Sequence, residues 1–117
     1  MSPLAGIRVV EIAQNLAGPF AGQILAMLGA EVIKLERPEG GDDARGWGPP
    51  MHEGTATTFI AVNRGKRSLS LDLRNDADRA LLMELVGESD VVVQNMRPGA
   101  LEDLGRVARR SPRVFRG

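Results

Sequence analysis

Two short apolar segments of this chain end in the same way, with an arginine followed by a proline. Residues 31–36 lead directly into Arg37-Pro38, and residues 91–96 lead into Arg97-Pro98. Both segments are predicted to be buried strands, and the carboxyl ends of parallel strands meet at the sheet edge where α/β proteins bind ligands. A guanidinium suits phosphate oxygens because it donates two parallel hydrogen bonds. The pattern therefore predicts an α/β protein that holds a phosphorylated ligand.

The order of apolar and helical segments predicts an α/β fold, a mostly parallel sheet with flanking helices. A strand–helix–strand unit of this kind has a right-handed crossover. We predict strands at residues 7–12, 31–35, 68–73 and 91–94. We predict helices at residues 19–28, with Phe20, Ile24, Leu25 and Leu28 as the buried stripe, at 75–87 after an Asn75 or Asp76 cap, and in short pieces at 57–63 and 98–104.

The predicted domain is incomplete. Its sheet has about four strands, fewer than the usual five to six, and the last strand has no visible successor. Residues 37–57 contain five glycines and three prolines without periodicity, which predicts a long loop. Residues 106–117 contain five arginines and no pattern that completes a fold. We therefore divide the chain into a partial domain at residues 1–105 and a divergent or truncated basic tail at residues 106–117.

Charge and composition exclude several classes of function. The 15 basic and 15 acidic side chains cancel, so no net field draws the chain to nucleic acid or to an anionic membrane. Without cysteine, the chain has no disulfide or thiolate chemistry. It begins with no secretory signal, and no apolar run approaches the roughly 18 residues of a membrane span. We expect a cytoplasmic protein with no nucleic-acid or membrane partner.

Polar residues outside the strand ends do not predict a metal site. His52 is the only histidine, so zinc has no second nitrogen ligand and no thiolate. We interpret Glu39, Asp42 and Asp43 as carboxylates that solvate a glycine-rich loop. The basic pair Lys66-Arg67 is interpreted as a solvated turn.

A dinucleotide such as NAD is not expected either. Residues 13–19 lack the G-x-G-x-x-G spacing that lets a backbone approach a pyrophosphate. Glu36 ends a strand where such folds place a ribose-binding acid, but one acid at a strand end is weak support. Arg37 and Arg97 have an alternative role as exposed residues in surface ion pairs, and their placement at two strand ends favours phosphate contact.

Six segments, in this order, resemble the N-terminal part of the family III CoA-transferases (the CaiB/BaiF family). That family includes formyl-CoA transferase, carnitine CoA-transferase and α-methylacyl-CoA racemase. The segments are PLAGIRVVE (3–11), LAGPF (16–20), LGAEVIKLERP (28–38), GDDARGWGP (41–49), NRGKRSLSLDL (63–73) and DVVVQNMRPGAL (90–101). Any one of these would be weak support, whereas six in one order are highly specific.

The resemblance implies a Rossmann-like large domain, of which residues 1–105 would be the N-terminal part, and CoA as the ligand. The residues that it implies as CoA contacts are Leu16 and Ala17 beside the thioester, Arg37 near the nucleotide, Leu71, Asp72, Leu73 and Arg74 as one contact segment, and Asn95, Met96 and Arg97 after the fourth strand. The formyl-CoA enzyme has glutamine at the position of Leu16, so oxalate-related specificity is not implied. Asp103 occupies a position that is basic in some members, and we assign it no phosphate.

The family moves CoA between an acyl-CoA and a carboxylic acid, through an aspartate that attacks the thioester. That aspartate would lie beyond Gly117, so we predict no catalytic residue within this chain and no activity of the chain alone. CoA or an acyl-CoA is the expected substrate, with no metal or NAD, and complete members are expected to be homodimers. The alternatives are a fragment of a 2-methylacyl-CoA racemase and a non-catalytic CoA-binding remnant.

Overall fold

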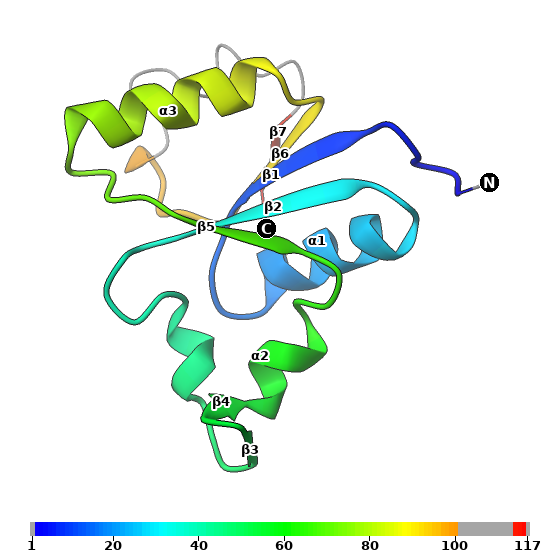
Figure 1. The fold of residues 1–117 in the computed structure, drawn as a ribbon, viewed down its shortest axis with the longest axis vertical. Coiled ribbons are helices and arrows are strands. Elements are labelled where there is room, and N and C mark those ends of the chain that lie inside the picture. The colour runs from blue at the N-terminus through cyan, green and yellow to red at the C-terminus, as the bar shows by residue number, and fades with distance from the viewer. Residues whose placement is uncertain (1, 101–113, 117) are drawn as a thin grey trace.

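The computed structural model describes residues 2–100 and 114–116 of the chain (Figure 1). In chain order its elements are β1 (Arg8–Ile12), α1 (Ala17–Met27), β2 (Glu31–Glu36), the short 3-10 helix η1 (Asp43–Gly46), β3 (Met51–His52), β4 (Thr55–Ala56), α2 (Thr57–Ala61), β5 (Arg67–Ser70), α3 (Asp76–Gly87), β6 (Val91–Gln94) and β7 (Val114–Arg116).

Within the described residues, five strands form one parallel sheet in the order β5-β2-β1-β6-β7. Numbered along the chain, this is the 3-2-1-4-5 arrangement from which doubly wound sheets of the Rossmann type are built. The predicted parallel α/β fold is confirmed. The predicted number of about four strands is wrong, because β7 pairs with β6 from within the segment interpreted as a tail. Residues 106–113 and 117 of that segment lie outside the described part of the chain.

Each face of the sheet has its own apolar core, because successive side chains of a strand point to opposite faces. Helix α3 packs Leu82 and Val86 against one face, which includes Val92. Helix α1 covers the other face, which includes Val9 and Val93. Figure 1 shows these two helices on opposite sides of the sheet. Each fully buried Val or Leu contributes roughly 1.5–3 kcal/mol relative to an exposed one.

Helix α3 begins where the sequence predicts. The side-chain oxygen of Asn75 accepts hydrogen bonds from the N–H groups of Ala77 at 2.8 Å and Asp78 at 3.3 Å. These bonds satisfy two of the backbone donors that a helix start leaves unpaired. Asp76 and Asp78 in the first turn also complement the positive end of the helix dipole.

The buried face of α1 differs from the predicted one. Three residues of the predicted stripe are largely exposed: Phe20 (55%), Ile24 (43%) and Leu28 (40%). Leu25 does pack against the core, but the helix also turns Gly22 toward the sheet, where an added Cβ would lie 1.9 Å from Oε1 of Glu11. Apolar residues lie all around this helix, so their spacing identified a helix without identifying which side is buried.

Residues 37–57 contain more structure than the predicted long loop. Helix η1 is followed by an antiparallel hairpin of β3 and β4, and then by α2. This excursion projects from the sheet at the bottom of Figure 1. The predicted strand at 68–73 is also too long, because β5 ends at Ser70, after which the Leu71 N–H makes one more hydrogen bond to the Glu36 carbonyl at 3.0 Å. Of the short helix predicted at 98–104, residues 101–104 lie outside the described part.

Candidate functional site

A groove of about 720 Å³ lies along the edge of the sheet where the strands end. The loops that follow β1, β2, β5 and β6 all contribute to its lining. The strand order reverses between β1 and β6, and the crevice at such a reversal is the usual ligand site of an open α/β sheet. The groove therefore has the position that the two Arg-Pro strand ends predict.

Eight of the ten residues predicted to contact a ligand line this groove: Arg37, Leu71, Asp72, Leu73, Arg74, Asn95, Met96 and Arg97. They come from three loops that are far apart in sequence. Leu16 and Ala17 are not among the lining residues and lie exposed at the start of α1, with Leu16 52% exposed. In their place the loop after β1 contributes Gln14 and Asn15. Ligand contact by any of these residues remains a prediction.

Arg37 and Arg74 reach the groove as members of ion pairs. Arg37 donates from Nε to the Glu39 carbonyl at 3.0 Å and pairs through Nη2 with the Asp43 carboxylate. Arg74 donates from Nε to Oδ1 of Asp72 at 3.0 Å, and this contact lowers the pKa of Asp72 and raises that of Arg74. The carboxylates hold the guanidinium groups at the groove, and they also compete with any anionic ligand for the same donors.

The loops after β1 and β6 are joined across the strand reversal by Asn95. Its Oδ1 accepts from the Gln14 N–H at 3.1 Å, and its Nδ2 donates to the Gln14 carbonyl at 2.7 Å. The side chain thus bonds to the N–H and the carbonyl of one residue, as a paired strand would, at the point where the main-chain pairing of β1 and β6 ends. Arg97, two residues further on, is exposed at the groove.

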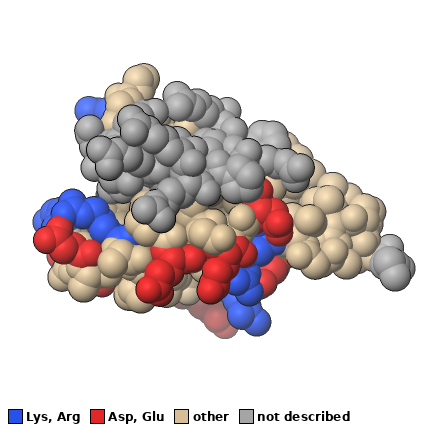
Figure 2. All heavy atoms as spheres, turned by 90° about the horizontal axis from the view of Figure 1, so that it is seen from above, with Lys and Arg blue, Asp and Glu red and all other residues tan. Residues whose placement is uncertain are grey.

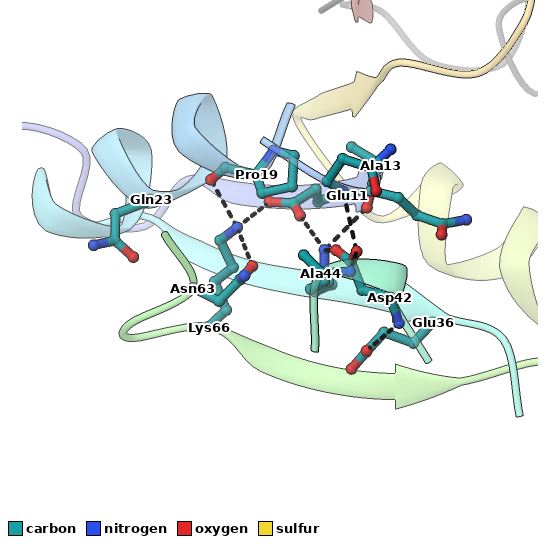
Figure 3. Close-up of polar contacts among 12 residues, drawn as sticks. Glu11, Ala13, Pro19, Gln23, Glu36, Asp42, Ala44, Asn63 and Lys66 are labelled. Atoms are coloured by element: carbon teal, nitrogen blue, oxygen red, sulfur yellow. Dashed lines mark hydrogen bonds and ion pairs between the residues drawn. The ribbon is translucent and has the colours of Figure 1, made fainter. Parts of the chain in front are cut away.

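Four charged side chains form a buried cluster on the α1 face of the sheet: Glu11, Lys34, Asp42 and Lys66 (Figure 3). Nζ of Lys34 lies 2.9 Å from Oε2 of Glu11 and 2.8 Å from Oδ2 of Asp42. Nζ of Lys66 lies 2.6 Å from Oε1 of Glu11. All four side chains are at most 2% exposed. The two positive and two negative charges cancel, so each buried charge has an opposite partner.

The interpretation of two of these residues from the sequence is wrong. Lys66 was expected in a solvated turn and Asp42 in a solvated loop, yet both side chains are buried. Burial lowers the pKa of Lys66, and the Glu11 carboxylate opposes that shift. Nothing in the local sequence around Lys66 marks it as buried, because its partner Glu11 lies on a strand far along the chain.

Glu36 forms a second polar centre beside the cluster. Arg45 donates to Oε1 from Nε and to Oε2 from Nη2, each at 2.7 Å, and the Asp42 N–H donates to Oε1 at 2.9 Å. Burial alone would raise the pKa of this carboxyl, but the bonds from Arg45, Ser68 and Asp42 outweigh burial and bring the pKa down from 4.5 to about 2. Both oxygens are engaged within the protein, so Glu36 does not offer a ribose the free acid of a dinucleotide site.

Three further features of the described residues concern other kinds of site. On the face drawn in Figure 2, basic and acidic side chains lie beside one another, with no extended basic area among the described residues. No group of three or more His, Asp or Glu side chains in residues 2–100 has the arrangement of a metal site. In the same part of the chain, no helix has the length and apolar character to cross a membrane.

Several residues that shape the site were missed by sequence reasoning. Glu11 and Lys34 are polar positions within strands that otherwise bury apolar side chains, and they face each other in the register of β1 and β2. Two opposite charges at matching positions of neighbouring strands are a signal that could have found this pair. Asn15 and Asp43 carry no comparable signal, because both lie in loops whose course the sequence does not determine.

The chain is similar to known proteins over most of its length. Residues 4–114 match the profile of CoA-transferase family III. The chain is 50% identical over 109 residues to the succinate–glutarate CoA-transferase of Agrobacterium fabrum, covering 88% of this chain and 27% of that protein. It is 45% identical over 105 residues to the succinyl-CoA:glutarate CoA-transferase of Mus musculus, covering 90% and 24%.

A solved structure shows the same fold. The crystal structure of a CAIB/BAIF family protein from Brucella suis superimposes with a TM-score of 0.86 at 48% sequence identity. The likeness covers 95% of this chain and 31% of that protein. The chain thus spans about a quarter to a third of the length of the relatives that it matches.

Proposed function

The chain belongs to CoA-transferase family III, and we propose on this premise that its groove is part of the CoA-binding site of an acyl-CoA:carboxylate CoA-transferase. The observation that carries the proposal is the convergence of three arginines, Arg37, Arg74 and Arg97, on one groove at the carboxyl edge of the sheet. CoA carries a 3′-phosphate and a pyrophosphate, and arginine is the side chain best suited to bind such groups.

The two sides of the groove suit the two halves of CoA. Arg37 and Arg74 follow β2 and β5, so the phosphates are proposed to lie on that side. Residues 14–17 follow β1, so the uncharged pantetheine arm and the thioester are proposed to extend toward them. Leu16 and Ala17 do not line the groove as it stands, and they would contact only a ligand that reaches past Gln14.

The proposed reaction is transfer of CoA between an acyl-CoA and a carboxylic acid. In the family, a carboxylate nucleophile attacks the thioester carbonyl, releases CoA and forms a mixed anhydride, which divides one exchange into easier steps. We propose that none of the aspartates in residues 1–117 is this nucleophile. Purified residues 1–117 should therefore exchange no CoA, and any exchange activity of this chain would contradict that part of the proposal.

The relatives bear on the choice between transfer and racemisation. Those from A. fabrum and M. musculus are named for transfer to or from succinate and glutarate, which favours a transferase over a racemase. We accordingly propose short dicarboxylic acids as the acceptor class. A homodimer and a cytoplasmic location of the complete protein both remain predictions from the family resemblance.

Calorimetric titration of CoA into the purified chain tests the site. The variants are Arg37→Ala, Arg74→Ala and the double variant, and Arg8→Ala is a matched control because Arg8 pairs with Glu31 at the opposite end of the strands. Each groove arginine that contacts phosphate should contribute about 1.5–3 kcal/mol to binding, whereas the control should bind as the wild type does. A folded wild-type chain that binds no CoA would contradict the proposal for this chain.

A further inference from the structure

The buried charge cluster holds residues 13–19, which form the loop after β1 and the first turn of α1, at three points along their length. Nζ of Lys34 donates to the Ala13 carbonyl at 2.9 Å. Oδ1 of Asp42 accepts from the Asn15 N–H at 3.0 Å. Nζ of Lys66 donates to the Pro19 carbonyl at 2.8 Å. Figure 3 shows Lys66 in contact with both Pro19 and Glu11. The beginning, middle and end of this segment are thus each bound by a buried charge.

The three contacts act through one network. Glu11 accepts from Lys34 on one oxygen and pairs with Lys66 on the other, and Lys34 also pairs with Asp42. The four side chains come from β1, β2 and the segments after β2 and before β5. The loop is therefore tied to the centre of the sheet and to the excursion that ends at β5.

The middle contact is made at a residue with a special backbone conformation. Asn15 has a φ of 73°, in the left-handed region, which asparagine adopts more readily than most residues other than glycine. Asn15 also lines the groove. The Asn15 N–H donates to the Asp42 carboxylate, and the Asp42 side chain is fully buried.

We infer that the cluster Glu11–Lys34–Asp42–Lys66 sets the position of residues 13–17 relative to the arginines of the groove. Asp42, Lys34 and Lys66 are thus positioning residues that act on a ligand through the loop without touching the ligand. The consequence of this positioning for ligand binding rests on the proposed function. If phosphates bind beside Arg37 and Arg74, loosening the loop weakens contacts with the pantetheine arm and leaves contacts with the nucleotide in place.

Amide hydrogen exchange in the ligand-free chain tests the positioning directly. Asp42→Ala removes the acceptor of the Asn15 N–H, and Val86→Ala is the matched control, because it opens a cavity under α3 and touches no member of the cluster. Relative to the control, Asp42→Ala should raise exchange at residues 13–17 by about tenfold or more. Asp42→Asn keeps an oxygen acceptor but removes the charge opposite Lys34, and should give a smaller rise in the same direction.

Exchange at residues 13–17 that rises no further in either Asp42 variant than in Val86→Ala would overturn the inference. Asp42→Asn keeps the test decisive where Asp42→Ala does not fold.

Titrations with CoA and with adenosine 3′,5′-bisphosphate, the nucleotide half of CoA, test the consequence for binding. Asp42→Ala should weaken CoA by about tenfold and leave the bisphosphate within about twofold. A parallel loss for both ligands, or no loss for either, would contradict the positioning role. A wild-type chain that binds neither ligand would contradict the proposed function instead, and the exchange measurement would still decide the role of the cluster.

Discussion

The side chain of Asn95 forms two hydrogen bonds with the backbone of Gln14, one with its N–H at 3.1 Å and one with its carbonyl at 2.7 Å. These residues follow β6 and β1, which are neighbours in the sheet. The pair extends the contact between the two strands beyond the last main-chain pairing. It therefore ties together two walls of the groove where the strand order reverses.

Asn95→Ala should loosen these two walls. The substitution removes both hydrogen bonds, each with a net value of about 0.5–1.5 kcal/mol, so the free energy of unfolding should fall by about 1–3 kcal/mol. CoA should also bind more weakly. Urea unfolding and calorimetry measure the two effects. Glu88→Ala, at an exposed side chain near the opposite sheet edge, should change the free energy of unfolding by no more than about 0.5 kcal/mol, and an Asn95→Ala effect no larger than that would refute the linkage.

Asp43→Asn should strengthen the binding of phosphate ligands. The Asp43 carboxylate occupies the guanidinium of Arg37, and a neutral amide competes less with an anion for the same donors. The affinity for adenosine 3′,5′-bisphosphate should rise severalfold, by up to about tenfold. Combined with Arg37→Ala, the Asp43→Asn substitution should give no gain, since the gain acts through that arginine. An equal gain in affinity with Arg37 and with Arg37→Ala would contradict this prediction. It would indicate that the charge of Asp43 acts on the ligand without Arg37.

Gly22→Ala tests how closely α1 approaches the buried cluster. An added Cβ would lie 1.9 Å from Oε1 of Glu11, so either the helix or the carboxylate must move. Displacing Glu11 would leave Lys66 without its buried partner, and the free energy of unfolding should fall by about 3–5 kcal/mol. Gly87→Ala is the matched control, because Gly87 lies in α3 with nothing within 4 Å of an added Cβ.

In the control, the intrinsic helix preference of alanine should leave stability unchanged or raised by up to about 1 kcal/mol. Thermal or urea unfolding compares the two variants. Equal free energies of unfolding for Gly22→Ala and Gly87→Ala would contradict the close approach of α1 to Glu11.

Glu36 should make folding stability depend on pH in the acid range. Its pKa is lowered from 4.5 to about 2 in the folded protein, so the folded state binds a proton less readily than the unfolded state. The stabilising contribution is complete above pH 4.5 and is lost as the pH falls through 4.5 toward 2. Urea unfolding at several pH values should show this loss in the wild type.

Glu36→Gln should remove this part of the pH dependence and lower stability at neutral pH by about 1.5–3 kcal/mol, because Arg45 loses a charged partner. Wild type and Glu36→Gln should then approach the same stability near pH 2. If the free energies of unfolding of the two proteins differ by the same amount at every pH down to about 2, the low pKa does not belong to Glu36.

Much of the groove could be predicted from the sequence because it depends on where strands end. Runs such as Val91–Gln94 favour strands, and Arg37 and Arg97 follow two of them closely. Parallel pairing then brings these residues to one edge whatever the details of packing. Leu16 and Ala17 were implied only by the family resemblance, and neither lines the groove. The course of the loop after β1 depends on contacts with Lys34, Asp42 and Lys66 that come from elsewhere in the chain.

By itself the sequence determined β1, β2, β5 and β6, the helices α1 and α3, and the sheet edge at which the groove lies, because hydrophobic periodicity and strand ends are local properties. Only the tertiary structure decided which side of α1 is buried and which charges leave the solvent. Lys66 and Asp42 stand in polar, glycine-rich surroundings that are typical of a loop, yet both are buried because each meets an opposite charge there. Such pairing is a property of residues brought together by the whole fold, since a buried charge is tolerated only where a partner compensates its lost hydration.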